Sequence, residues 1–408
     1  MPSAAAQPAR TAPPTHALST HAVHGLRAVA AVLVVCMHLT GAVGFEGKVF
    51  GADEPRALDW LRTAGAGIGV DAFFTISGFF MLLTTCSRPG RVRVRRTLWR
   101  RLVRVLPLYW LVTTGVLAIH LVAPGAVNGS QEHPPDVVSS YLLLPQAGLP
   151  LLLVGWTLTH IVVFYGVFCL GLLTRSRAGL WAVLGGWSAF VLTVHLLAGD
   201  STSPFVRFLG DLLNLEFVLG AAVAQALLAG WRRFGGLALG VGAGALLVLA
   251  GLRLVPVAGS DGLGYRVFGV AVAVALLLYG VVAREQVTGW RTPGWLLGVA
   301  TASYSLYLVH VPLLGAMAVV AARLPLPHAV PVRVAVVLLA LLACVVAARL
   351  THRWVERPLT AAFDGTDWSL PRDWLVGYRR PRSLPGQVAR QEAAPEPGTQ
   401  ERSKRSLR

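Results

Sequence analysis

The chain has 408 residues, of which 55% are hydrophobic and 13% are charged. Soluble domains carry about 25% charged residues, so this composition excludes an ordinary soluble protein and predicts an all-α integral membrane protein. The formal net charge is +17, but the basic residues form short clusters between apolar stretches, as the positive-inside rule describes, which argues against a nucleic-acid-binding domain.

The two ends of the chain differ from the middle. Residues 1–24 are rich in Ala, Pro, Thr and His without apolar periodicity, and we expect a disordered cytoplasmic lead. They lack the features of a cleaved signal peptide, so the apolar stretch that follows is expected to be an uncleaved anchor. Residues 25–358 are predicted to form one transmembrane domain. Residues 359–408 are polar, Pro-rich and basic at the end, which predicts a disordered cytoplasmic tail.

Ten stretches between these ends are apolar and close to the length of about 20 residues that crosses a bilayer. The strongest basic cluster, from Arg88 to Arg104, lies between the second and the third stretch. Placing this cluster in the cytoplasm predicts that both termini are cytoplasmic as well. The predicted spans lie near 26–45, 67–86, 106–123, 150–173, 178–198, 206–229, 234–252, 265–283, 295–322 and 331–350.

The first span carries Arg27 near one end and His38 eleven residues later. On a helix, this spacing places the two side chains within about 20° of each other and roughly 16 Å apart along the axis. Polar groups inside a bilayer are costly and mark function by default. We therefore predict that the two residues face one path for an elongated substrate. The alternatives are that Arg27 only reaches to the interface and that His38 is a packed histidine bonded to a carbonyl.

Further polar residues lie inside the later spans. Counted from the outer ends of the spans, Asp71 is expected at a depth similar to that of His38, within about one helical turn. A carboxylate there would fix the tautomer of the imidazole, although Asp71 could instead cap a helix start. The other groups could bind an acceptor or carry protons: Trp156, Thr157 and His160; Asp211, Asn214 and Glu216; Ser303, Tyr304, Ser305, Tyr307 and His310.

The order of several motifs resembles the acyltransferase 3 family of membrane-bound acyltransferases. Its members include O-acetylases of lipopolysaccharide and exopolysaccharide and O-acyltransferases of macrolide sugars. Each motif is weak alone, but the ordered set is specific and spans residues 24–359. The motifs are HGLRAVAAVLVVCMH (24–38), GVDAFFTISGF (69–79), RRLVRVLPLYW (100–110), WTLTHIVVFY (156–165), LEFVLG (215–220), SYSLYLVHVPLL (303–314) and VERPL (355–359).

The resemblance implies roughly ten transmembrane helices, a cytoplasmic acyl-CoA donor, no permanently bound cofactor, and an acceptor hydroxyl that is often presented on the opposite side. The Arg and His that the family treats as essential in the first span correspond to Arg27 and His38. By the same resemblance, Asp71 and Ser77 carry the second motif. The third motif contributes Arg101, Arg104 and Tyr109.

One position departs from the family pattern. Family members usually have a glutamate where this chain has Ile161, three residues after Leu158 in the WTL motif. His160 points about 100° away from that position, so it need not replace the missing carboxylate. Glu216, from another span, could compensate.

These residues lead to a hypothesis of acyl transfer without a covalent intermediate. His38, oriented by Asp71, would act as general base on an acceptor hydroxyl that attacks the thioester. Arg27 would hold the pantetheine amides or a phosphate of the donor. The arginines from Arg93 to Arg104 would neutralise the nucleotide phosphates, although this cluster also serves as a topology signal.

Other polar residues have simpler alternative roles. Ser77 is interpreted as a packing residue, because Gly78 follows it and no nucleophile elbow is present. Tyr307 and His310 could simply form interhelical hydrogen bonds. The four cysteines lie inside apolar stretches at no metal-ligand spacing, which predicts buried thiols and no metal site: Cys36, Cys86, Cys169 and Cys344.

The function predicted is an acyl-CoA-dependent O-acyltransferase in the plasma membrane of a bacterium. Its expected partners are acyl-CoA, the lipid bilayer and a sugar or glycoside acceptor, such as an exopolysaccharide sugar or a macrolide sugar. The alternative is a transporter or flippase for a glycosylated or lipid substrate, although the two repeated halves typical of secondary transporters are not seen. A third alternative, an inactive scaffold, rests only on Ile161.

Overall fold

The computed structural model describes residues 18–41, 44–51, 59–86, 94–127, 133–198, 201–252 and 269–364, all of which lie in one compact unit, 1–368. The regular elements in these ranges are all helices, and nine segments are long and apolar enough to cross a membrane. The apolar helix α10 (Gly235–Gly251) adds 17 residues, or about 25 Å. The prediction of an all-α polytopic membrane protein is confirmed; of the ten predicted spans, the one near 234–252 corresponds to the shorter helix α10.

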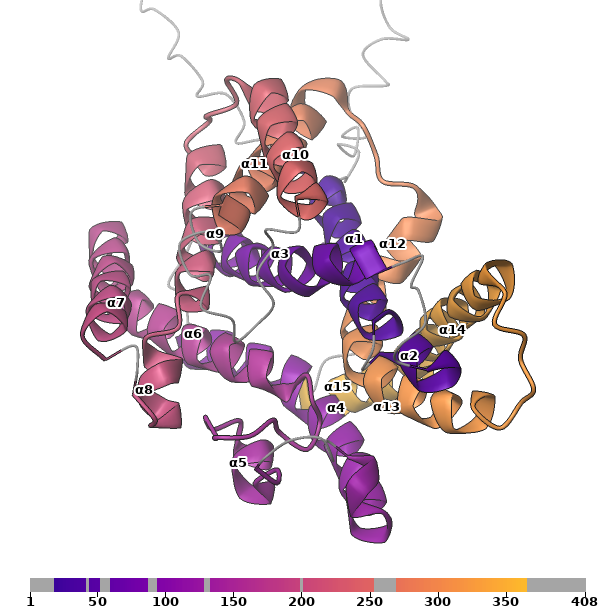
Figure 1. Cartoon of the computed structure of the whole chain (residues 1–408). Coiled ribbons are helices and arrows are strands. Elements are labelled where there is room, and N and C mark those ends of the chain that lie inside the picture. Colours follow the sequence, from indigo (N-terminus) through magenta and orange to yellow (C-terminus); the bar gives the residue numbers. More distant parts are fainter. Residues whose placement is uncertain are drawn as a thin grey trace, which may run out of the picture. The chain divides into compact units, whose positions relative to one another are not determined.

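Helix α1 (His21–Leu39) packs along α3 (Asp59–Cys86), which in turn packs on α9 (Leu213–Leu228) (Figure 1). Two motif glycines allow the backbones of α3 and α9 to approach closely. A Cβ atom on Gly78 would lie 1.9 Å from the carbonyl oxygen of Phe217, and one on Gly220 would lie 1.8 Å from that of Thr75. Any larger residue at either position would push the two helices apart, as at other small-residue membrane interfaces.

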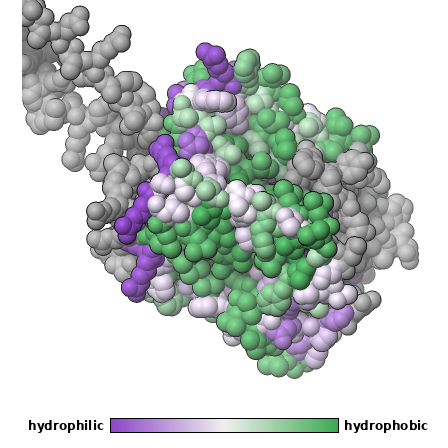
Figure 2. Space-filling view, turned by 90° about the vertical axis from the view of Figure 1, so that its left-hand side faces the viewer, coloured by the Kyte–Doolittle hydropathy of each residue, from purple (hydrophilic) through white to green (hydrophobic). Residues whose placement is uncertain are grey.

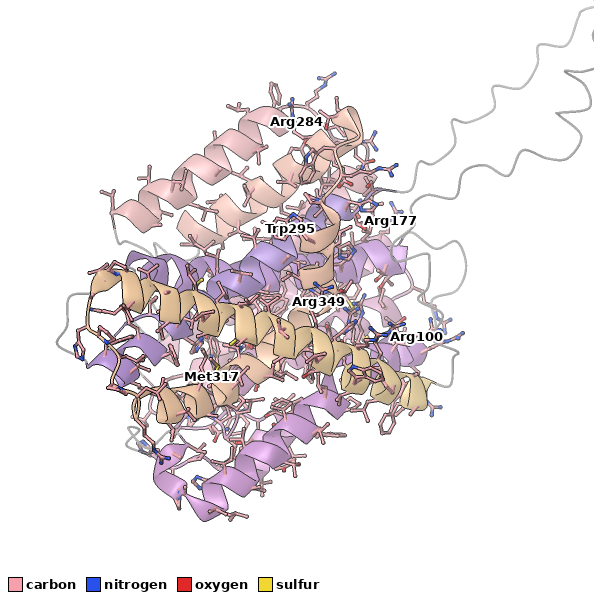
Figure 3. The ribbon with its side chains drawn as sticks, turned by 90° about the vertical axis from the view of Figure 1, so that its right-hand side faces the viewer. Arg100, Arg177, Arg284, Trp295, Met317 and Arg349 are labelled. Atoms are coloured by element: carbon pink, nitrogen blue, oxygen red, sulfur yellow. The ribbon has the colours of Figure 1, made fainter. Side chains whose placement is uncertain are left out.

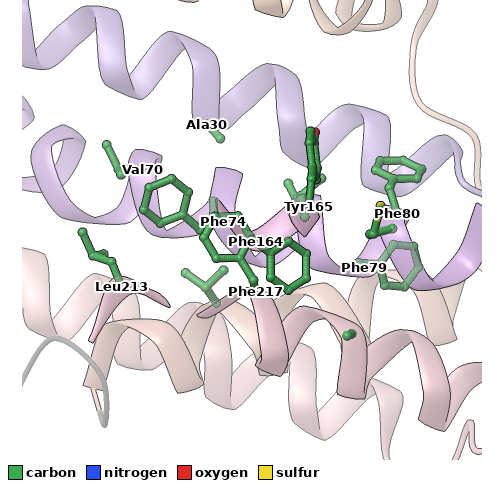
Figure 4. Packing of buried hydrophobic residues seen from close by; sticks show 14 of the residues in the cluster. Ala30, Val70, Phe74, Phe79, Phe80, Phe164, Tyr165, Leu213 and Phe217 are labelled. Atoms are coloured by element: carbon green, nitrogen blue, oxygen red, sulfur yellow. The ribbon is translucent and has the colours of Figure 1, made fainter. Parts of the chain in front are cut away.

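Aromatic side chains fill the space between α3, α9 and α6 (Gly155–Leu173). The Phe217 ring stacks on Phe74 at 4.7 Å and on Phe164 at 4.5 Å between ring centroids, as Figure 4 shows from close by. Ile161, which replaces the expected glutamate, packs against this same core. The core thus fixes α6 rigidly against the α1–α3 pair.

Helix α11 (Val272–Thr288) packs along α10 and anchors the start of α1. The Glu285 carboxylate accepts hydrogen bonds from the hydroxyl of Ser19 and from the backbone N–H groups of His21 and Ala22. These are donors that the first helical turn leaves without an intrahelical partner. Because of this cap, α1 begins at His21, before the predicted domain boundary at residue 25; residues 1–17 lie outside the described part of the chain.

The C-terminal helices are α12 (Gly294–Thr301), α13 (Ser303–Ala321) and α14 (Val330–Thr351), followed by the π-helical turn η3 (His352–Glu356) and α15 (Arg357–Asp364). The predicted span 295–322 is therefore divided at Ala302, and helix continues beyond the predicted boundary at 358. The rest of the predicted tail, 365–408, lies outside the described residues. The short helix α2 (Phe45–Phe50) is fixed to α14 by a buried ion pair in which Arg333 Nη2 lies 2.8 Å from Glu46 Oε1.

The remaining helices are α4 (Val94–Val122), the 3₁₀ turn η1 (Pro124–Ala126), α5 (Val137–Leu142), α7 (Arg177–Ala198) and α8 (Pro204–Leu209). The predicted span 206–229 is divided between α8 and α9. Figure 2 shows a broad apolar surface on one face of the molecule, as expected where helices meet lipid. Figure 3 shows Arg100 and Arg177 at one end of the helices and Met317 toward the other, in line with one basic membrane face.

Candidate functional site

The structure brings two of the predicted histidines together. His38 lies one residue before the end of α1, and His310 lies two turns into α13. The Nε2 atom of His310 is 3.3 Å from the Nδ1 atom of His38, and the two ring centroids are 4.9 Å apart. His310 is fully buried and His38 is partly buried. The sequence predicted both residues as site members but did not predict that they pair.

The hydrogen bonds of this pair assign the protons on both rings. Each Nδ1 atom faces a backbone carbonyl one helical turn earlier, at 3.0 Å for His38 with Val34 and at 2.9 Å for His310 with Leu306. A carbonyl only accepts, so each Nδ1 carries a proton and each Nε2 keeps its lone pair. His310 Nε2 therefore accepts a second branch of the His38 Nδ1–H bond. The Nε2 of His38 has no hydrogen-bond partner within the described part of the chain.

Tyr307 continues the pair toward α6. Its hydroxyl lies 2.6 Å from the Thr157 hydroxyl, which donates to the Val154 carbonyl at 2.9 Å. The Tyr307 ring also lies edge-on to Phe73 of α3 at 5.7 Å. Tyr307 thus forms the interhelical bond that the sequence offered as an alternative, and it fixes α13, which carries His310, against α6.

A second group of polar residues surrounds Arg27. This side chain is partly buried and close enough to Arg101, Arg104 and Glu356 to interact electrostatically with all three. Arg101 donates to the Thr84 hydroxyl at 2.6 Å and lies 6.0 Å from the centroid of the Tyr165 ring. The group holds three guanidinium groups and one carboxylate, so it carries a net positive charge inside the molecule. We call Arg27, Arg101, Arg104 and Glu356 the arginine cluster.

Glu356 ties this cluster to α13. Its Oε2 atom accepts from the Ser305 hydroxyl at 2.5 Å and lies 2.8 Å from Nδ1 of His352. One residue earlier on α13, the Tyr304 hydroxyl donates to the Val105 carbonyl of α4. The sequence placed Glu356 in the VERPL motif but gave it no role. Its burial, at 6% exposure, was not readable from a segment next to a polar tail.

Neither Asp71 nor Glu216 is a hydrogen-bond partner of the His38 ring among the described residues. Gly69 packs against Ala30 and Val34 of α1, and Asp71 lies further along α3 in the direction away from His38. The bonding partners of His38 are Val34 and His310 instead. Glu216 is fully buried in α9 beside Phe217. The expectation that Asp71 orients the His38 ring is therefore corrected, because His310 occupies that position.

The remaining predicted residues gather at the start of α6. His160 places Nδ1 3.1 Å from the Trp156 carbonyl and Nε2 3.3 Å from Oδ2 of Asp211. Tyr109 donates to the Ser140 carbonyl of α5. Trp156, His160 and Tyr109 all line a cavity of about 250 Å³ between α5, α6 and α8. Asp211 also lines it; the sequence showed this residue as polar within a span but did not pair it with His160.

The segment that covers this cavity begins at Asp136, outside the membrane-spanning helices. The Asp136 side chain accepts a hydrogen bond from the backbone N–H of Ser139 and caps the start of α5. This bond to the charged form holds the pKa of Asp136 below its ordinary value.

No group of three or more His, Cys, Asp or Glu side chains that could hold a metal occurs among the described residues. Cys36, Cys169 and Cys344 are buried free thiols, and the Cys86 side chain lies outside the described part of the structure.

One comparison with known proteins identifies a family, and another finds a curated relative. The sequence profile described as an acyltransferase domain, acyltransferase 3, matches residues 20–349. The exopolysaccharide production protein ExoZ of Rhizobium meliloti (strain 1021) is 33% identical over 260 residues, which cover 61% of this chain and 76% of ExoZ. No solved structure matches the chain.

Proposed function

Because this chain belongs to the acyltransferase 3 family, a family of membrane acyltransferases, we propose that it transfers a short acyl group from cytoplasmic acyl-CoA to a hydroxyl group of a polysaccharide sugar. We place it in the plasma membrane of a bacterium, where both the donor and a growing polysaccharide are within reach. The similarity to an exopolysaccharide production protein favours a polysaccharide over a macrolide as the acceptor.

The observation that carries the proposal is the position of α13 between the two polar groups. Ser305 bonds Glu356 in the arginine cluster, and His310 bonds His38 five residues later, which is about 7.5 Å along the helix. A bound acyl-CoA whose phosphates contact the arginine cluster would thus have its thioester directed toward the histidine pair. Guanidinium forks suit phosphate oxygens, so Arg27, Arg101 and Arg104 are the proposed donor contacts.

The chemistry requires one base and no covalent intermediate. His38 Nε2 takes the proton of the acceptor hydroxyl while the hydroxyl oxygen attacks the thioester carbonyl carbon. The carbon–sulfur bond then breaks, and the leaving thiolate receives the proton from His38. The Val34 carbonyl and His310 both accept from the Nδ1–H of His38, so Nε2 is the nitrogen that takes up the proton and then returns it.

The test is the release of free thiol from acetyl-, propionyl- and isovaleryl-CoA by the purified protein, with and without oligosaccharide acceptors. A positioned general base contributes about 10²–10⁴-fold, so His38→Ala should lower kcat by about that factor. His120→Ala is the matched control, because His120 lies at the end of α4 and has no proposed role.

Two outcomes would contradict the proposal. If no donor were consumed by the wild type above the His38→Ala background, the chain would not be an acyl-CoA-dependent enzyme. If instead a saccharide crossed proteoliposome membranes without thiol release, the transporter interpretation would replace it.

A further inference from the structure

The cavity between α5, α6 and α8 is a second polar site with a composition of its own. Its walls come from the turn after α5, the first turns of α6, and residues 204–211 of α8 and the turn that follows. The volume of about 250 Å³ lies just below the 300–1,000 Å³ typical of pockets for drug-sized ligands. A space of this size suits one sugar ring rather than a nucleotide.

Charged and polar groups in the cavity are held in fixed positions. Asp211 has one carboxylate oxygen bonded by the Leu213 N–H at 3.0 Å and the other 3.3 Å from His160 Nε2. Its side chain is 36% exposed, and it lines the cavity. Arg207, one helical turn earlier, is exposed, and its guanidinium has no partner within the described residues. The cavity wall therefore holds both a carboxylate and a guanidinium group.

Aromatic rings form the other wall. Phe208 lies 4.5 Å from the His160 ring and Trp156 lies 5.9 Å from it, measured between centroids. Trp156 and Phe208 are each only partly buried. A pyranose has an apolar face of C–H groups and a rim of hydroxyls, which match an aromatic wall flanked by a carboxylate and a guanidinium. Hydrophobic walls with a few placed polar groups are the usual design of small-molecule sites.

The first turns of α6 separate this cavity from the histidine pair. Gly155, Trp156, Thr159 and His160 line the cavity, and on a helix they occupy one face. Thr157 lies on the opposite face and bonds Tyr307, one turn from His310. A sugar in the cavity would thus lie on the far side of α6 from the proposed base, so it cannot be the ring that is acylated.

We propose that this cavity is a subsite for a second sugar ring of the acceptor, one that is recognised but not acylated. The acceptor would then be an oligosaccharide or polysaccharide, with free monosaccharides as poor substrates. This inference rests on the proposed function, because it assumes that the acylated hydroxyl belongs to a saccharide. Asp211 and Arg207 would bond the hydroxyls of this ring while Trp156 stacks on its C–H face.

Binding can be measured without any acyl transfer. Saturation-transfer NMR on the purified full-length protein in detergent would compare cellotriose and laminaritriose with glucose and galactose. We expect a trisaccharide to bind at least tenfold more tightly than the monosaccharides, and Arg207→Ala and Asp211→Asn each to remove most of that difference. Arg323→Ala is the matched control, since Arg323 is also exposed and lies just after α13. Because Arg207 is a surface residue, its replacement should leave folding intact.

The outcomes separate the two proposals. Binding of a trisaccharide that depends on Arg207, with no thiol release from any acyl-CoA, would keep the subsite and overturn the transferase. Acyl transfer with equal kcat/KM for monosaccharides and trisaccharides, unchanged in Arg207→Ala, would overturn the subsite and keep the transferase. If neither trisaccharide bound the wild type more tightly than glucose or galactose, the subsite would also be overturned.

Discussion

At the scale of single residues, His310 acts on the proposed base through one hydrogen bond. Its Nε2 accepts from His38 Nδ1 at 3.3 Å, so replacing it leaves the His38 ring held by the Val34 carbonyl alone. His310→Ala should lower kcat about tenfold, which corresponds to a hydrogen bond worth about 1.4 kcal/mol. The KM for acyl-CoA should stay within about twofold, because the arginine cluster is untouched.

A conservative variant distinguishes positioning from a general loss of packing. The amide oxygen of His310→Gln can accept the His38 proton in place of Nε2, so this variant should keep more activity than His310→Ala. Steady-state kinetics of both variants, with His120→Ala as the control, would distinguish a positioning role of His310 from a packing role. Equal activity in His310→Ala and the wild type would show that the bond has no catalytic role.

The sequence identified His38 and His310 but assigned His38 the wrong partner. The depth of Asp71 in the membrane was predicted by counting from the start of a span at residue 67. The helix α3 starts earlier, at Asp59. Asp71 is therefore twelve residues into its helix, and Gly69 sets the register by packing on Ala30 and Val34. Register between two apolar helices depends on such contacts, which a hydropathy pattern does not contain.

At the scale of helices, the cap on α1 comes from a residue more than 260 positions away in the chain. Glu285 receives one hydroxyl and two backbone N–H groups at the start of α1. Hydrogen bonds to a charged group are worth about 1.5–3 kcal/mol, so Glu285→Ala should destabilise the protein by about that amount. Because α1 carries both Arg27 and His38, activity should be lost at lower temperature as well.

The check is to measure the Tm of each variant by thermal unfolding in detergent, and then the enzymatic activity that remains after brief heating. Glu285→Gln retains one acceptor oxygen and should show a smaller loss of Tm than Glu285→Ala. The control is Gln286→Ala, which removes only a bond from the neighbouring side chain to the Ser19 carbonyl. A Tm for Glu285→Ala equal to that of the control would mean that the cap contributes nothing.

The helical structure of the apolar stretches was predictable, because a long apolar stretch that crosses a bilayer has one stable form. Two interruptions in the spans were not predictable from the sequence: the break at Ala302 between α12 and α13, and the break between α8 and α9. Neither break is marked by a proline, and each lies inside a stretch whose hydropathy predicts a single span. The second break places Asp211 beside His160, and the first precedes the turn that carries Tyr304 and Ser305, so the unpredicted features are those that build the two polar sites.

At the scale of the whole molecule, the two proposed sites lie at different heights along α6, one at its start and one near its middle. Gly155 and Trp156 line the saccharide cavity, whereas Arg101 lies over Tyr165, ten residues further and about 15 Å along the same helix. The arginine cluster also lies near the end where Arg100 is seen in Figure 3, which the positive-inside rule assigns to the cytoplasm. Donor and acceptor should therefore reach the histidine pair from opposite sides of the membrane.

This sidedness can be measured in proteoliposomes of known orientation. With the purified protein inserted so that the arginine cluster faces outward, external acetyl-CoA should release thiol only when an oligosaccharide acceptor has been sealed inside, and the acylated saccharide should be found in the lumen. In vesicles of the reverse orientation, external acetyl-CoA should release no thiol above the His38→Ala background until detergent opens the membrane. Thiol release at equal rates in both orientations of sealed vesicles would contradict a donor path from the basic face. Acylation of an acceptor supplied only on the acetyl-CoA side would place both substrates on one face, and the cavity at the start of α6 would then need another occupant.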